Sequence, residues 1–280
     1  MWTKTTRSQY ARKSVGYATD LTDAEWYEIE LFMPPECTRG RPRQQKPRRI
    51  LDALLYLLRS GCPWRLLPKD FPPMTTVQYY FYKWRDTGFW QILNYQLVQM
   101  ARRAVGRHAS PSAGVIDSQS VKTTESGGLS GYDAGKKIKG RKRHIITDTL
   151  GLLIDAVVHT ADVQDRDGAP LVFKRIAKRV PSLRHVFADG GYAGPKLRNA
   201  LKKIGPWTIE IIKRSDVAKG FEVLPRRWVV ERSFGWFGRN RRLAKDFETT
   251  IASATSWLFM ASIQLTLRKL TYPAKYGISY

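Results

Sequence analysis

The sequence predicts an α/β domain built on a mixed β-sheet and preceded by a small all-helical domain. In the first third of the chain, apolar residues recur with the 3.6-residue spacing of amphipathic helices. In the remainder, two apolar segments flank a hairpin-like Leu150-Gly151, and later segments alternate with helical ones. Strands that are joined first by a hairpin and later by helices are typical of a mixed sheet. The pattern changes at residues 106–113, a small and polar stretch that we expect to be a linker.

The first third is expected to contain a basic arm over residues 1–20 and a helical domain over residues 21–105. Thr22 and Glu25 form a capping box, which predicts that a helix begins there, and Pro34 predicts that it has ended. Three more helices are predicted: one ending at Gly61, one beginning at Thr75 and one over residues 89–105. This domain can be a relative of the helix-turn-helix, which places a helix in the DNA major groove, but Leu and aromatic stripes are equally typical of a core. We therefore leave open whether it reads DNA sequence.

Residues 114–280 are predicted to form the α/β domain. Strands are expected over residues 114–121, 144–149, 152–159, 185–188 and 208–212, with helices over residues 170–180, 196–204 and most of the chain from residue 225 onward. The last helix, over residues 251–270, is apolar enough to belong to the core or to a dimer surface.

The chain is strongly basic. Its 280 residues include 48 Lys and Arg against 24 Asp and Glu, a formal net charge of +24. Such an excess repels itself, so a polyanionic partner is expected, and nucleic acid fits best because each neutralised phosphate releases condensed counterions. The alternative is a basic protein of another kind, such as a ribosome-associated factor, because charge alone says nothing about chemistry.

Composition disfavours several other kinds of site. Cys37 and Cys62 form no CxxC pair, which indicates a reducing interior. The four histidines lack zinc-binding spacing, so we expect them to be packed or surface residues. No apolar run approaches the ~18 residues of a membrane span, and the start of the chain lacks a secretory signal. The sequence therefore predicts no membrane contact and, with DNA as partner, a cytoplasmic and nucleoid-associated protein.

Three acidic residues stand out by their positions. Asp117 interrupts the apolar strand GVIDSQSV, Asp189 ends the apolar run HVFA before two glycines, and Glu231 lies in the predicted helix RRWVVERSFGWFG. In open α/β sheets, ligands collect beyond the carboxyl ends of strands, where Asp189 is expected. Carboxylate oxygens are the ligands that Mg²⁺ prefers, and two such ions can activate the attacking oxygen and stabilise the leaving one in phosphoryl transfer. The pattern predicts a site for paired magnesium ions.

The helix around Glu231 contains two glycines that need an explanation. Gly235 and Gly238 lie one and two turns after Glu231, and a glycine inside a helix costs about 1 kcal/mol relative to alanine. Space for a DNA backbone beside a metal-binding carboxylate would explain them. The alternative is that Arg227, one turn before Glu231, forms a surface ion pair with it while the glycines pack against another helix. That order of charges is the weaker one for a helical pair.

Several other acidic residues compete with these three. Asp162, Asp165 and Asp167 are interpreted as a loop and a helix N-terminus, where negative charge stabilises the helix dipole. Asp148 and Asp155 flank the predicted hairpin and are expected to be solvated.

Four segments together resemble the DDE transposases of bacterial insertion sequences, in the insertion-sequence-five family: GVIDSQSVKT, GYDAGKKIKGRKRHIITDTLGLL, FADGGYAG and RRWVVERSFGWFGRNRRLAKDFE. The likeness extends to LTDAEW and RILDALLYLLRSGCPWRLLP, so it covers almost the whole chain. It implies a ribonuclease-H-like catalytic domain with a mixed five-stranded sheet flanked by helices. It also implies that Asp117, Asp189 and Glu231 are the catalytic residues and the ligands of two Mg²⁺ ions, for which Mn²⁺ can substitute.

Related transposases also place a Tyr, an Arg and a Lys at fixed intervals around the Glu. Arg227 keeps the Arg interval, whereas the Tyr position is Leu224 and the Lys position is Gly238. Lys245 and Arg239 are candidates to replace the missing Lys.

The resemblance implies double-stranded DNA as the partner, at the transposon ends and at the target, and a homodimer or larger synaptic complex because two ends must be joined. The expected DNA contacts are basic residues, together with Trp228, which can stack on a base or pack in the core: Lys122, Lys136, Lys137, Lys139, Arg141, Lys142, Arg143, Arg227, Arg239, Arg241, Arg242 and Lys245. The implied reaction is hydrolysis at the transposon terminus, followed by attack of the freed 3′-hydroxyl on target DNA. Two alternatives stay open: a ribonuclease-H-like nuclease that does not join ends, and a non-enzymatic DNA-binding protein derived from a transposase.

Overall fold

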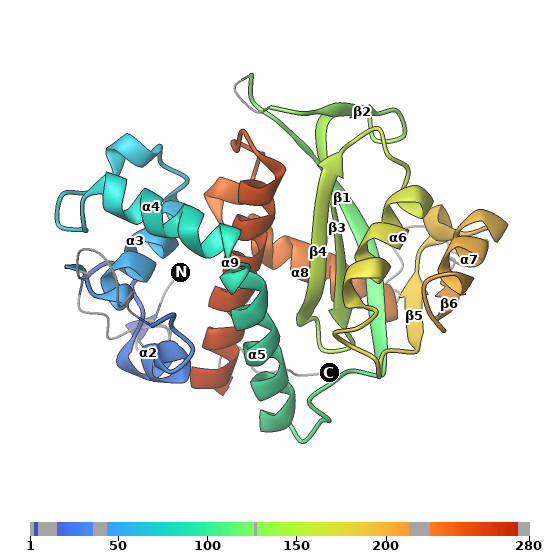
Figure 1. The fold of residues 1–280 in the computed structure, drawn as a ribbon, viewed down its shortest axis with the longest axis horizontal. Helices are drawn as coiled ribbons and strands as arrows, with labels where there is room; N and C mark the ends of the chain where they lie inside the picture. The colour runs from blue at the N-terminus through green and yellow to red at the C-terminus, as the bar shows by residue number, and fades with distance from the viewer. Residues whose placement is uncertain (1–2, 5–15, 36–43, 126–127, 213–224, 274–280) are drawn as a thin grey trace.

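The fold is a mixed sheet with helices on both faces and a group of helices beside it (Figure 1). The structure, a computed structural model, describes residues 3–4, 16–35, 44–125, 128–212 and 225–273. In order, the strands are β1 (Ala113–Lys122), β2 (Gly131–Asp133), β3 (Ile138–Asp148), β4 (Leu153–Thr160), β5 (His185–Ala188) and β6 (Thr208–Ile211).

The strand order confirms the predicted fold class. β3 pairs antiparallel with β1 on one side and β4 on the other, and β5 pairs parallel with both β1 and β6. The five longer strands therefore run β4-β3-β1-β5-β6, the mixed five-stranded sheet that the resemblance implies. The short β2 adds a sixth strand beside the beginning of β3. It was not predicted, because its three residues are too few to show a strand pattern.

The two faces of the sheet are covered by different helices. Val115 and Ile145 belong to a core that they share with α8 (Pro225–Gly238) and α9 (Ile251–Thr271). Ile116 and Ile146, the next residue on each strand, instead pack against α6 (Asp165–Ile176) and α7 (Pro195–Lys202). The alternation follows from the strand, whose successive side chains point to opposite faces.

The N-terminal helices share a core with the last helix of the chain. They are α2 (Asp23–Glu30), α3 (Pro47–Ser60), α4 (Met74–Asp86) and α5 (Phe89–Ala104). All four contact α9, and both α9 and α5 also lie against β4 (Figure 1). The ring of Trp257 in α9 stacks on Phe81 in α4 with centroids 4.5 Å apart. Of the two roles left open for the last helix, the core role is therefore the one observed, and a single apolar core spans both sides of residues 106–113.

Local signals place several boundaries correctly. The capping box is present, since Thr22 and Glu25 exchange side-chain to backbone hydrogen bonds, and Gly61 ends α3 with a φ of 70°. Two elements begin earlier than predicted. β3 starts at Ile138, because its basic residues conceal the apolar pattern, and α6 starts at Asp165, with Pro170 inside the helix. None of the helices in the described ranges is long and apolar enough to cross a lipid bilayer.

Gly61 is expected to be essential for docking α3 against the segment that follows α8. A Cβ at Gly61 would lie 3.1 Å from both the carbonyl carbon of Arg241 and the backbone nitrogen of Arg242. Gly106 has a similar φ of 71°, but a Cβ there would meet nothing within 4 Å. We expect Gly106→Ala to lower the free energy of unfolding by about 1–2 kcal/mol, the cost of the left-handed conformation, and Gly61→Ala to lower it further. Denaturant unfolding measures both, and equal losses would show that the close approach at Gly61 has no energetic effect.

Candidate catalytic site

Two neighbouring parallel strands bring Asp117 and Asp189 together. β1 pairs with β5 in a register that matches Val115 with Phe187. Asp117 and Asp189 each lie two residues further along, so they fall at the same level and on the same face of the sheet. One carboxylate oxygen of each accepts a local backbone hydrogen bond, from Ser118 at 2.7 Å and from Gly191 at 2.9 Å respectively. The predicted meeting of these two acids is what the strand register produces.

Helix α8 covers this face and carries Glu231. It contacts β1, β3 and β5, and it is anchored by the buried side chains of Val230, Phe234 and Phe237. The hydroxyl of Ser233 donates to the carbonyl oxygen of Gly151 at 3.0 Å, which ties α8 to the turn before β4. Glu231 is half-buried, with 38% of its side chain exposed. A Cβ at Gly235 or Gly238 would meet nothing within 4 Å, so neither glycine is required by close packing among the described residues.

The Asp117 carboxyl lies in an environment that disfavours its charge. Its pKa is raised from 3.8 to about 7, chiefly by burial and also by the negative charge of Asp189. The N–H of Ser118 and the positive charges of Lys136 and Arg227 act in the opposite direction. Asp117 and Asp189 are thus an interacting pair of like charges, with two cations near enough to reduce the repulsion.

Arg227 connects Glu231 to this pair. Its Nη2 lies 3.2 Å from Glu231 Oε1, one helical turn away, so the ion pair considered as an alternative is present. Arg227 is also close enough to Asp117 to lower the pKa of that carboxyl. The arginine therefore interacts with Glu231 directly and with Asp117 through its charge.

The donor chemistry suits a divalent cation at Asp117 and Asp189, but the three acids do not yet form one cluster. Within the described residues, no three Asp, Glu, His or Cys side chains lie close enough together to hold a metal ion. A cation between Asp117 and Asp189 would offset both the burial of the Asp117 carboxylate and its repulsion by Asp189. Glu231 is instead paired with Arg227.

A further carboxylate, Asp165, borders the site, although the sequence analysis assigned it only to a helix N-terminus. The phenol of the buried Tyr192 lies near all three aspartates. Burial is the main cause of its raised pKa, and the negative charges of Asp117, Asp165 and Asp189 raise the pKa as well. A Cβ at Gly191 would lie 3.1 Å from Asp189 Oδ1 and 3.3 Å from Asp165 Oδ2, so both acids border the same small space.

Asp165 is held at the start of α6 by side chains from the sheet. The Ser118 hydroxyl donates to its Oδ1 at 2.7 Å, and Lys142 Nζ lies 3.0 Å from the same oxygen. As predicted, Asp165 stands at a helix N-terminus. Its place beside Asp117 and Asp189 comes from the packing of α6 on the sheet, which no local sequence pattern predicts.

Four predicted DNA contacts are corrected by the structure, because their side chains are buried and already bound within the protein: Arg141, Lys142, Arg143 and Arg242. Arg141 is fully buried, pairs with Asp246 and donates to three backbone carbonyls. Arg143 donates to the carbonyl of Leu243 at 2.8 Å. For the first three, the physical reason is that β3 is flanked by strands on both sides and covered on both faces, so its basic residues point into the protein. Arg242, which follows α8, is buried against Trp257 and paired with Glu248. As they lie, these side chains cannot reach a phosphate.

The other predicted contacts are at the surface. Seven basic residues are exposed: Lys122, Lys136, Lys137, Lys139, Arg239, Arg241 and Lys245. Lys136 also reaches the carbonyl oxygen of Ser118 at 3.1 Å, next to Asp117. Trp228 is 41% exposed and is therefore not a core residue. Leu224, at the Tyr position of the resemblance, lies outside the described residues.

Asp148 and Asp155 are buried, not solvated as expected. Asp148 pairs with Arg102 and accepts hydrogen bonds from two backbone N–H groups. Asp155 pairs with Arg175 of α6 and with Arg179, which follows this helix. Both acids have a structural role, because they neutralise arginines that pack against the turn end of the β3–β4 hairpin.

Comparison with known proteins identifies the family. The profile described as "Transposase DDE domain" matches residues 108–265, which is more than half of the chain. The chain belongs to the DDE transposases. A second profile, described as "Putative transposase of IS4/5 family", matches residues 21–94 and places the helical region in the same group.

Two curated relatives of this transposase match parts of the chain. The "Putative transposase for insertion sequence element IS402" of Burkholderia cepacia is 32% identical over 116 residues, covering 39% of this chain and 54% of that protein. The "Uncharacterized protein y4sN" of Sinorhizobium fredii is 34% identical over 84 residues, covering 30% of this chain and 65% of that protein. The chain thus spans between half and two thirds of the length of these relatives. No solved structure matches the transposase.

Arg141 is expected to stabilise the fold, with little direct effect on DNA affinity. Arg141→Met would leave Asp246 buried without its partner, which should lower the free energy of unfolding by about 3–5 kcal/mol. Lys139→Met, two residues earlier and exposed, should change it by less than about 0.5 kcal/mol. Chemical denaturation measures both. Equal stability of the two variants would contradict a structural role for Arg141.

The Asp117 pKa predicts a pH-dependent loss of stability. Between pH 3.8 and about 7 the folded protein holds a proton on Asp117 that the unfolded chain has released, so this contribution to stability decreases as the pH rises through that range. Asn cannot ionise, so Asp117→Asn should be more stable than the wild type at a pH of about 8 and closer to it at about 5. Urea unfolding without divalent cations tests this, with Glu30→Gln on α2 as control. Parallel pH profiles for the wild type and Asp117→Asn would refute the predicted pKa.

Proposed function

We propose that this transposase binds the ends of an insertion sequence, cleaves them, and joins the freed 3′-hydroxyls to target DNA. The observation that carries the proposal is the meeting of Asp117 and Asp189 beneath the helix that bears Glu231, in a chain of the DDE family. The proposed contacts for DNA phosphates are the exposed basic residues among those predicted from the sequence, Lys136 among them.

The proposed role of the acids is to hold divalent cations, Mg²⁺ or Mn²⁺. Asp117 and Asp189 would bind them first, because their carboxylates already interact across β1 and β5. Bound cations would stabilise the negative charge on the attacking and leaving oxygens of a phosphodiester. Asp117 must be ionised to act as a ligand, and with a pKa of about 7 it loses its proton more readily once a cation replaces it.

We propose that the Glu231 carboxylate leaves its ion pair with Arg227 and binds a cation held by Asp117 and Asp189. The Arg227–Glu231 pair is partly exposed, so its separation costs little, about 1 kcal/mol or less. The exchange would also free the Arg227 guanidinium, beside the reacting phosphate, to donate to a phosphate oxygen. We therefore propose that Arg227 holds Glu231 in the free protein and holds DNA in the complex.

Joining two ends requires two catalytic sites or a site used twice, and we propose a homodimer or larger complex assembled on DNA. The experiment must distinguish this function from two alternatives, a nuclease that does not join DNA ends and a DNA-binding protein without enzymatic activity.

The test uses DNA taken from both flanks of the coding region, with a target plasmid and Mg²⁺. We expect wild-type protein to cut these ends and to join pre-cleaved ends to the plasmid. Asp117→Asn, Asp189→Asn and Glu231→Gln should each lower the rate at least 100-fold, which corresponds to about 2.7 kcal/mol of lost transition-state stabilisation. All three should still bind DNA, because phosphate contacts are made by other residues.

Glu30→Gln, a matched change on exposed α2, should keep full activity. Cutting without joining would indicate a nuclease. DNA binding without either reaction, or cutting that survives all three substitutions, would refute the proposed function.

A further inference from the structure

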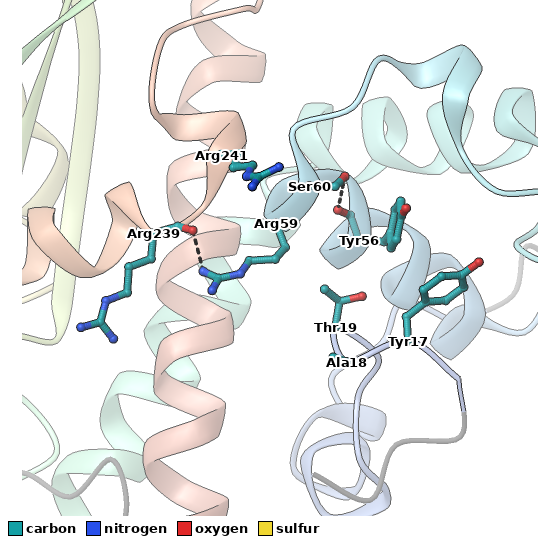
Figure 2. A pocket seen from close by; sticks show the side chains of 8 residues that line it. All are labelled: Tyr17, Ala18, Thr19, Tyr56, Arg59, Ser60, Arg239 and Arg241. Carbon is teal, nitrogen blue, oxygen red and sulfur yellow. Dashed lines mark hydrogen bonds between the residues drawn. The ribbon is translucent and has the colours of Figure 1, made fainter. Parts of the chain in front are cut away.

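A basic pocket lies where the helical region meets the segment after α8 (Figure 2). Its volume is about 390 Å³. The lining residues come from three parts of the chain, the segment before α2, the end of α3 and the turn after α8: Tyr17, Ala18, Thr19, Tyr56, Arg59, Ser60, Arg239 and Arg241. The pocket does not include Asp117, Asp189 or Glu231, but its residues Arg239 and Arg241 directly follow α8, the helix that carries Glu231.

The walls of the pocket are held together by contacts between residues far apart in sequence. Arg59 Nη1 donates to the carbonyl oxygen of Arg239 at 2.5 Å (Figure 2). In the opposite direction, Arg242 Nη1 donates to the carbonyl oxygen of Cys62 at 3.2 Å. Between them, Gly61 approaches the backbone of the turn closely. These contacts fix the end of α3 against the turn after α8, so the pocket is a built feature of the fold.

The chemistry of the lining favours an anion. Arg59 and Arg241 supply two guanidinium groups, and no Asp or Glu is among the lining residues. Within the part of the chain that the structure describes, the guanidinium of Arg241 makes no hydrogen bond or ion pair. The Oγ1 of Thr19 is buried and has no hydrogen-bond partner among the described residues. Guanidinium groups bind phosphate oxygens through paired N–H donors.

The pocket is larger than a phosphate group needs. The rings of Tyr17 and Tyr56 stand across the cavity from Arg59 and Arg241 (Figure 2). An apolar wall opposite two cations suits a ligand that has an anionic end and an uncharged part, as a nucleotide unit of DNA has. The guanidinium of Arg239 points away from the Arg59 side chain, so we assign its backbone, and not its charge, to the pocket (Figure 2).

We propose that this pocket binds one phosphodiester group of DNA, held jointly by Arg59 and Arg241, with the attached sugar against the tyrosines. The inference rests on the proposed function, because DNA is the ligand in both. It assigns the helical region a direct DNA contact through the end of α3, whether or not that region reads sequence. It also places a DNA contact, Arg241, on the turn that follows α8, the helix that carries Glu231.

The test is the salt dependence of binding to a short labelled DNA duplex of arbitrary sequence. Each phosphate contact that is lost should lower the slope of log Kd against log salt concentration by about one. Because both arginines hold the same phosphate, Arg59→Ala, Arg241→Ala and the double variant should each lower the slope by about one, with several-fold weaker binding. Arg198→Ala, an exposed arginine on α7 at the other end of the molecule, is the matched control and should leave the slope unchanged (Figure 1).

The outcomes separate this inference from the proposed function. A double variant that binds with the wild-type slope overturns the pocket, even if the wild type cuts and joins DNA. A double variant that loses about two from the slope overturns the shared phosphate, because it indicates two independent contacts. Wild-type protein that binds DNA with the predicted pattern but never cuts it supports the pocket and refutes the enzyme. Thermal unfolding of each variant checks that the fold is intact, and Arg59→Lys with Arg241→Lys should recover part of the slope because the charge is kept.

Discussion

The parallel pairing of β1 with β5 is the constraint on which the site depends. Its register sets Asp117 beside Asp189, and helix α8 packs over the same face of the sheet. Burial is the main cause of the raised pKa of Asp117, and the negative charge of Asp189 adds to it. The fold therefore maintains an unfavourable arrangement at this point, which a bound cation would make favourable. Strain of this kind is expected at a functional site and needs support from the rest of the structure.

That support includes an interior with many charged groups. Arg141 pairs with Asp246, and Arg102 pairs with Asp148, and all four side chains are buried. Part of the large positive charge is thus neutralised inside the protein and holds the sheet to the segments after α8 and at the end of α5. Other Lys and Arg side chains of the described residues are exposed, and these are the ones that we propose for contact with DNA. A net charge read from composition does not distinguish these two groups, which have different physical roles.

The same distinction explains what the sequence could and could not predict. Apolar runs located β1, β4, β5 and β6, and the acids within or just after them singled out Asp117 and Asp189. That the two acids meet follows from the parallel register of β1 and β5, which required the structure. The run of basic residues in β3 was interpreted as a phosphate-binding surface, since a Lys or Arg in an isolated strand looks solvated. Its burial follows from pairing on both sides, which is a property of the sheet. Asp165 was interpreted only as part of a helix N-terminus for a similar reason, because its approach to Asp189 depends on how α6 packs. The Arg227–Glu231 pair was visible in the spacing, but its contact with Asp117 required the fold.

The central claim is that Asp117 and Asp189 form a cation site that Glu231 completes after leaving Arg227. The most direct measurement is a titration of the protein with Mn²⁺, in which electron paramagnetic resonance reports the free ion. Wild-type protein should remove Mn²⁺ from solution, and Mg²⁺ should compete for the same site. Asp117→Asn and Asp189→Asn should abolish this binding, and Glu231→Gln should weaken it. Equal Mn²⁺ binding by the wild type and by the two Asp variants, or no Mn²⁺ binding by the wild type in the presence of DNA, would contradict the claim.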